Sequence, residues 1–297
     1  MKRLDLHGTY TAFITPFKDD LSVDFEAINE LIEKQIAANI EGLVVLGTTG
    51  EAQTLTMKEK VAIMLKIQEQ VNGRVPIIVG TGSNDTRATI EFTMLAAEHH
   101  FDGVLLVAPY YNKPTQEGLY NHFLAISESV DINMIIYNVP GRTSVNISPE
   151  TVQKIAEECS NVIAIKESSG NVEQIMKVIR FAPDDFITMC GDDILAVPTI
   201  YMGAKGIVSV ISNYAPKQFG DCVRKALEKN ITEANKLHYD LFDLMQVNFV
   251  ETSPVPVKSI MKELGLIKNS LVRLPLITIT ENNLNLIKTI LADKKIC

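Results

Sequence analysis

Residues 162–170 read Val-Ile-Ala-Ile-Lys-Glu-Ser-Ser-Gly, a short β-branched run that ends in a lysine and is followed by small polar residues. The pattern predicts a buried strand with Lys166 at its end. Burial strips water from an ammonium group and favours the neutral amine, which is a nucleophile toward carbonyl carbon. An edge-strand lysine that points to water is an equally good reading of this stretch alone.

Similar short apolar runs recur along the first three quarters of the chain, and each predicts a strand. Turn residues such as glycine, proline and asparagine follow most of them. The runs are Thr9–Thr15, Gly42–Leu46, Val75–Val79, Gly103–Val107, Ile132–Tyr137, Val162–Ile165, Phe186–Cys190 and Gly206–Val210.

Segments with helical spacing of apolar residues separate most of these runs. Eight strands that alternate with helices predict an α/β fold, the (β/α)8 TIM barrel, with a doubly wound open sheet as the alternative. The repeat count favours the barrel, and no Gly-x-Gly-x-x-Gly fingerprint follows the first strand. The clearest helical segments are Phe25–Ala38, Pro149–Cys159, Val172–Phe181 and Pro216–Leu227.

The strand pattern stops after about residue 228. Helical patterns cover Leu227–Met245, Val257–Leu264 and Glu281–Leu291, with prolines between them. We therefore expect residues 1–228 to form a barrel catalytic domain and residues 229–297 to form a C-terminal helical extension.

Composition excludes several classes of function. The net charge of −8 argues against nucleic acid or an anionic membrane as a main partner. No signal peptide is evident, and no apolar run is long enough to span a bilayer. Histidine spacing predicts no metal site. The four cysteines, Cys159, Cys190, Cys222 and Cys297, form no Cys-x-x-Cys pair and are expected to be reduced thiols of a cytoplasmic protein.

The active site of a parallel barrel lies at the carboxyl ends of its strands. Polar, glycine-rich or tyrosine-containing turns follow six of the predicted strands, which is more than turn formation requires. These turns are Gly47-Thr48-Thr49-Gly50-Glu51, Gly80–Asn84, Pro109–Pro114, Tyr137–Thr143, Lys166–Gly170 and Gly191–Asp193.

Strand alternation predicts which of these side chains face inward. If Lys166 points into the barrel, small Ala164 shares its face and Glu167 points to the helices. The same parity places Tyr137 inward with Ile135, where a hydroxyl near the amine could move protons. An ordinary aromatic residue at the barrel rim is the alternative reading of Tyr137.

Two further turns offer groups that bind carboxylates. Thr48 and Thr49 supply hydroxyls in a tight turn whose backbone N–H groups could form an anion nest, although a plain turn reads the same way. Arg142 carries a planar guanidinium group that can bind a second carboxylate through two hydrogen bonds. The alternative reading is an arginine in a surface salt bridge. For Asp192 and Asp193, capping of a helix is favoured over metal binding.

Four motifs occur in this order with barrel-like spacing: Gly-Thr-Thr-Gly-Glu from residue 47, Pro-Tyr-Tyr-Asn-Lys-Pro from 109, Tyr-Asn-Val-Pro-Gly-Arg-Thr from 137 and Ile-Lys-Glu-Ser-Ser-Gly from 165. Together they resemble the dihydrodipicolinate synthase family of pyruvate-dependent class I aldolases, which includes N-acetylneuraminate lyase. The resemblance covers almost the whole chain.

The resemblance implies a catalytic set. Lys166 is expected to form a Schiff base with pyruvate, and Tyr137 to shuttle protons. Thr48 matches the threonine that links Tyr137 to a second tyrosine. Tyr111 looks like that second tyrosine, which reaches the site of a neighbouring subunit. The implied assembly is a homotetramer, a dimer of dimers.

The resemblance also implies substrate contacts. Thr49 matches the partner of the pyruvate carboxylate, and Arg142 matches the arginine that binds the carboxylate of L-aspartate 4-semialdehyde. Gly191 and Val208 match positions that line the site through their backbone, the latter often isoleucine in the family. No cofactor beyond the covalent Schiff base is implied, and the product feeds diaminopimelate and lysine synthesis.

One departure concerns regulation. Lysine-inhibited members carry histidines and a glutamate at an effector site, where this chain has Met57, Lys60 and Ala88. A cation and a missing carboxylate should weaken binding of a lysine amine, so we expect no feedback inhibition. Two other functions stay open: a sister aldolase for a sugar acid, which would not need Arg142, and a catalytically dead barrel that acts as a binding protein.

Overall fold

The computed structural model describes residues 3–294. Eight strands form a closed barrel in sequence order, and β1 pairs in parallel with β2, as do successive strands from β3 to β8. The (β/α)8 prediction is therefore confirmed over the open sheet. The strands are β1 (Gly8–Ala12), β2 (Gly42–Val45), β3 (Ile77–Gly80), β4 (Gly103–Val107), β5 (Met134–Asn138), β6 (Val162–Glu167), β7 (Ile187–Cys190) and β8 (Gly206–Ser209).

By its internal contacts the chain divides into two compact units. The first contains the chain up to Gly8 together with Pro76–Val208, and the second contains Thr9–Val75 and the chain from Ser209 onward. The first unit carries α3 (Thr86–Glu98), α4 (Gln116–Ser129), α5 (Pro140–Thr143), α6 (Pro149–Glu158), α7 (Val172–Phe181), η2 (Asp193–Leu195) and α8 (Ala196–Tyr201). The second carries α1 (Phe25–Ala37), η1 (Ala52–Thr54), α2 (Met57–Val71), η3 (Ile211–Asn213), α9 (Pro216–Leu227), α10 (Ile231–Val247), α11 (Val255–Glu263) and α12 (Glu281–Asp293).

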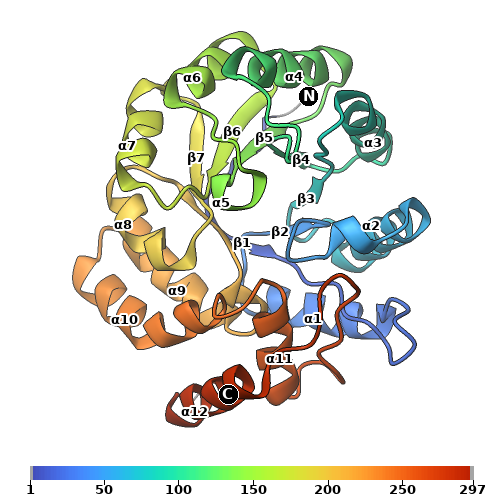
Figure 1. The fold of residues 1–297 in the computed structure, drawn as a ribbon. Helices are drawn as coiled ribbons and strands as arrows, with labels where there is room; N and C mark the ends of the chain where they lie inside the picture. Colours follow the sequence, from blue (N-terminus) through green and yellow to red (C-terminus); the bar gives the residue numbers. More distant parts are fainter. Residues whose placement is uncertain (1–2, 295–297) are drawn as a thin grey trace. The chain divides into compact units, whose positions relative to one another are not determined.

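In the first unit, β6 is buried along its whole length and lies between β5 and β7. Helices α6 and α7 pack beside each other next to these strands (Figure 1). Polar residues begin both helices: Ser148 accepts a hydrogen bond from the N–H of Thr151, and Asn171 accepts one from the N–H of Gln174. These caps fix the residues at which the two helices begin.

In the second unit, β1 pairs with β2, with Tyr10 opposite Gly42. The Tyr10 ring covers Gly42 so closely that a Cβ there would lie 2.1 Å from it, which explains the glycine. Gln35 of α1 accepts a hydrogen bond from Thr11 Oγ1 at 2.7 Å and donates one to the carbonyl of Ser212 at 2.8 Å. Buried polar contacts thus tie the first strand to the segment that follows β8.

The C-terminal helices differ from the sequence expectation at one point. Helices were expected over Pro216–Leu227 and Leu227–Met245; α9 ends at Leu227 as expected, but α10 begins only at Ile231. The side chain of Asn230 accepts a hydrogen bond from the N–H of Glu233 and so starts a new helix. Cys297 lies outside the described residues. Within residues 3–294, no helix has both the length and the apolar character needed to cross a membrane.

Candidate active site

Lys166 and Tyr137 are brought together by strand pairing. They occupy opposite register positions in β6 and β5, after the register shifts between Met134 and Ile135. Both side chains are buried, each with 7% exposure. The Lys166 Nζ lies 4.2 Å above the centroid of the Tyr137 ring. An amine and a phenol ring therefore share one face at the carboxyl ends of adjacent strands.

Glu167, the next residue along β6, points away from this pair. Its carboxylate accepts hydrogen bonds from Asn138 Nδ2 at 3.0 Å, from Gln174 Nε2 of α7 at 3.1 Å and from the Ser169 N–H at 2.7 Å. The predicted alternation is confirmed: the carboxylate faces the helix layer and is satisfied there.

Gly191 brings bare backbone against the lysine stem. A Cβ at this position would lie 1.8 Å from Ser168 Oγ and 2.8 Å from Lys166 Cε, so no larger residue fits without displacement. Ser168 Oγ is itself buried and has no hydrogen-bond partner in the structure. Sequence reasoning placed both residues in turns at the strand ends; it assigned Gly191 a role only through the family resemblance and gave Ser168 none. Only the position of Ser168, two residues after the lysine, could have pointed to it.

Two of the other predicted site residues in the first unit, Arg142 and Tyr111, are exposed, unlike Lys166 and Tyr137. Arg142 lies on the short helix α5 directly after β5, and its side chain is exposed. Tyr111 is 89% exposed and adopts a left-handed backbone conformation with φ of 74°. Val208 is buried on β8. No hydrogen bond links Arg142 or Tyr111 to Lys166 among the described contacts, so the structure assembles the lysine–tyrosine pair but leaves these two open to solvent.

The turn that carries Thr48 and Thr49 follows β2 in the second unit. The Gly50 N–H donates to the Gly47 carbonyl and the Glu51 N–H to the Thr48 carbonyl, each at 3.1 Å. These N–H groups close the turn and are not open to a ligand. Thr49 is buried in the turn, while Thr48 is half-buried. In this turn, the groups that hydrogen bonds within the turn leave available are the hydroxyls and N–H groups of the two threonines.

Asp192 acts as a cap, as the sequence favoured. Its side chain accepts a hydrogen bond from the N–H of Ile194 and begins η2. Burial raises its pKa. Burial also raises the pKa of the neighbouring Cys190 thiol to about 12, so the thiol stays protonated at neutral pH. Within residues 3–294, no group of three or more His, Cys, Asp or Glu side chains is arranged to hold a metal ion.

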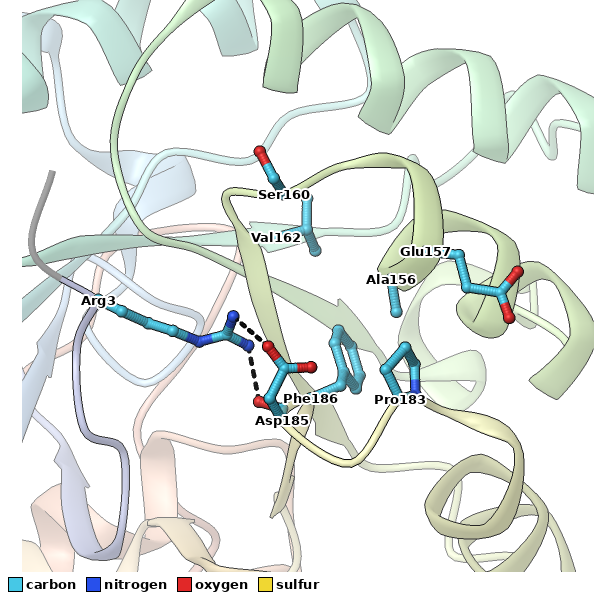
Figure 2. Close-up of a pocket in the computed structure, with 8 residues that line it drawn as sticks. All are labelled: Arg3, Ala156, Glu157, Ser160, Val162, Pro183, Asp185 and Phe186. Atoms are coloured by element: carbon cyan, nitrogen blue, oxygen red, sulfur yellow. Dashed lines mark hydrogen bonds and ion pairs between the residues drawn. The ribbon is translucent and has the colours of Figure 1, made fainter.

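A cavity of about 410 Å³ opens at the other end of β6 (Figure 2). Val162, which begins β6, lines it together with Phe186, and so do Arg3 and Asp185, which form an ion pair. Lys166 lies toward the opposite end of the same strand. The active site of a parallel barrel forms at the carboxyl end, so this cavity is not part of it.

Comparisons with known proteins identify the family of the chain. Residues 5–294 match the model of the Dihydrodipicolinate synthetase family. The chain belongs to the dihydrodipicolinate synthetase family. It is 46% identical to a 4-hydroxy-tetrahydrodipicolinate synthase of Desulfotalea psychrophila over 278 residues, which cover 94% of this chain and 93% of that protein. The enzyme of the same name from Fervidobacterium nodosum is 43% identical over 284 residues, covering 96% and 97% of the two chains.

Solved structures of the family have the same fold. The chloride-inhibited dihydrodipicolinate synthase of Acinetobacter baumannii, complexed with pyruvate, superposes with a TM-score of 0.96 at 38% identity. The superposition covers 99% of this chain and all of that one. This member of the dihydrodipicolinate synthetase family is an enzyme, a lyase with 4-hydroxy-tetrahydrodipicolinate synthase activity in lysine biosynthesis.

Proposed function

We propose that Lys166 carries out this activity by forming a Schiff base with pyruvate. The amine adds to the keto carbon and water leaves. Loss of a methyl proton then gives an enamine, whose carbon attacks the aldehyde of L-aspartate 4-semialdehyde. The amino group of the second substrate displaces the lysine and closes the ring, which frees the enzyme. The observation that carries the proposal is the buried Lys166 amine against the Tyr137 ring.

Tyr137 transfers the protons in this scheme. Its hydroxyl belongs to a ring that already contacts the amine, which supports a role in adding and removing protons as water leaves and returns. By resemblance, Thr48 connects this hydroxyl to Tyr111, and Thr49 binds the pyruvate carboxylate. Gly191 serves by having no side chain, because a Cβ would press on Lys166 Cε.

We propose that Arg142 determines the specificity for the second substrate. Its exposed fork at the end of β5 suits the carboxylate of L-aspartate 4-semialdehyde, and a sugar acceptor offers no carboxylate there. This residue separates the proposed function from a sister aldolase. An assay that compares L-aspartate 4-semialdehyde with N-acetylmannosamine as acceptor tests the choice, and turnover of the sugar alone would contradict it.

We expect Arg142→Gln to raise KM for L-aspartate 4-semialdehyde by about tenfold or more, because a hydrogen bond to a charged group is worth about 1.5–3 kcal/mol. KM for pyruvate should stay within about twofold, since pyruvate is bound elsewhere. Steady-state kinetics with each substrate varied in turn measures both. Arg180→Gln, at an exposed arginine on α7, is the matched control and should leave both constants unchanged.

We propose that the enzyme assembles at least as a dimer, and in the family's manner as a dimer of dimers. The 89% exposure of Tyr111 supports this, because a tyrosine so exposed is available to the site of a neighbouring copy. A cytoplasmic location is proposed from the thiol chemistry: Cys159, Cys190 and Cys222 are free and buried.

We also expect that lysine does not inhibit the enzyme. Met57 is exposed on α2 and offers no hydrogen bond to an ammonium group, while Ala88 supplies no carboxylate. Lys60 is half-buried, and burial lowers its pKa, yet it remains a donor rather than an acceptor. Initial rates measured with added lysine should match those with sodium chloride at equal ionic strength. An inhibition constant in the millimolar range or tighter would contradict the expectation.

A further inference from the structure

Glu51 and Lys258 form an ion pair inside the second unit. Their side chains are each 1% exposed, and Lys258 Nζ donates to Glu51 Oε1. Lys258 also donates to the Leu271 carbonyl at 2.9 Å and lies 4.1 Å above the Phe17 ring. The partners are far apart in the chain, since Glu51 follows β2 and Lys258 lies on α11. Neither has a role in the proposed chemistry.

Glu51 is the last residue of the turn that carries Thr48 and Thr49. Its N–H donates to the Thr48 carbonyl at 3.1 Å, so its position governs the closure of the turn. Its backbone is left-handed, with φ of 54°, a conformation that is unfavourable for a residue with a side chain. Such a conformation persists where surrounding contacts over-determine it. The carboxylate supplies those contacts.

The second carboxylate oxygen also has a partner. Glu51 Oε2 accepts from the backbone N–H of Arg273 at 3.0 Å. The Arg273 guanidinium then binds Glu59 of α2 and the Thr54 carbonyl, and its centre lies 4.6 Å above the Phe17 ring. One end of the threonine turn is therefore anchored to α11, to the segment after α11 and to the start of α2.

A buried ion pair is a poor source of net stability. The cost of removing two charges from water offsets most of their attraction, and apolar replacements are often as stable. Burial lowers the pKa of Lys258 to about 8, although the Glu51 carboxylate opposes the shift and Arg273 adds to it. What the pair does supply is a fixed direction for the Glu51 side chain, and hence for the turn.

We propose that the Glu51–Lys258 pair is a positioning device that fixes the Thr48–Thr49 turn, so that α11 sets the affinity of the enzyme for the carboxylate of pyruvate. The inference rests on the proposed function, in which Thr49 binds that carboxylate. Glu51 and Lys258 act through the turn and touch no substrate. Their loss should therefore change binding of pyruvate more than the chemical step.

Two variants test the proposal. Glu51→Gln keeps an oxygen for the Arg273 N–H and leaves Lys258 able to shed its proton at modest cost. The double variant Glu51→Gln with Lys258→Met removes both charges and preserves volume. We expect both to fold, with KM for pyruvate raised about fivefold to fiftyfold, kcat within about threefold of the unchanged enzyme, and KM for the aldehyde within about twofold.

Lys262→Met is the matched control, because Lys262 lies on the same helix with an exposed side chain; its kinetics and thermal midpoint should not change. An unchanged KM for pyruvate in either folded variant overturns the proposal, and so does a fall in kcat alone. Failure of both variants to fold also overturns it, since the pair would then support the whole unit. Borohydride trapping of pyruvate on the unchanged enzyme is run in parallel: no adduct there refutes the proposed function itself.

Discussion

Replacing Lys166 with methionine is expected to abolish covalent capture of pyruvate and to lower kcat by about a thousandfold or more, because the variant has no amine to form the Schiff base. Methionine fills similar space and keeps an unbranched stem, so the packing against Gly191 should survive. Borohydride reduction in the presence of pyruvate, followed by peptide mass mapping, measures the adduct directly. Initial rates measure the loss of turnover.

The matched control for this experiment is Lys177→Met. Lys177 lies exposed on α7, where its ion pair with Glu173 contributes little at the surface. This variant should be trapped by pyruvate as the unchanged enzyme is, with the mass increase on the peptide that contains Lys166. A pyruvate adduct that persists in Lys166→Met would show that another amine is the nucleophile. An unlabelled but fully active Lys166→Met enzyme would refute covalent catalysis.

Replacing Tyr137 with phenylalanine should lower kcat by about 10²- to 10⁴-fold, the usual loss when a positioned acid–base group is removed. The ring remains, so its contact with the Lys166 amine at 4.2 Å should remain as well. The defect is then confined to proton transfer. We expect borohydride trapping to reach the same final extent as in the unchanged enzyme but at a much lower rate, which a time course measures.

Tyr239→Phe provides the comparison for Tyr137→Phe, because Tyr239 is an exposed tyrosine on α10. Its rate and trapping time course should not change. A Tyr137→Phe enzyme with kcat within about threefold of normal would leave Tyr137 as an aromatic wall of the site, the reading that the sequence left open. Loss of trapping at all times would instead indicate that the ring no longer holds the lysine.

Strand ends were the weakest part of the sequence reading. The apolar run Val162–Ile165 was expected to form a strand with Lys166 at its end, but β6 continues to Glu167. Lys166 and Glu167 pair with Met189 and Cys190 of β7, which extends the strand past the last apolar residue. Hydrophobic patterning cannot detect such residues, because their backbones are held by neighbouring strands while their side chains carry chemistry.

Local sequence patterns were enough to predict the fold, the family and the orientation of side chains around Lys166. The alternation around Lys166 correctly placed Glu167 toward the helices, because successive side chains of a strand must point to opposite faces. The recurrence of strands and helices correctly predicted the closed barrel. Four short motifs indicated the family to which the chain belongs, and the helix cap at Asp192 was also foreseen.

Tertiary structure alone decided the contacts between residues that are distant in the chain. The approach of Gly191 to Lys166 and the burial of Glu51 against Lys258 depend on which elements lie side by side. No local pattern marks Lys258, since an unpaired lysine on a helix reads as a solvated charge. The cost of burying its charge is offset only because the Glu51 carboxylate, from another part of the unit, pairs with it. That pairing depends on the fold. Lys166 shows the same division. The sequence allowed either a nucleophile or a charge on an edge strand, and the closed barrel excludes the second reading because it has no edge strand.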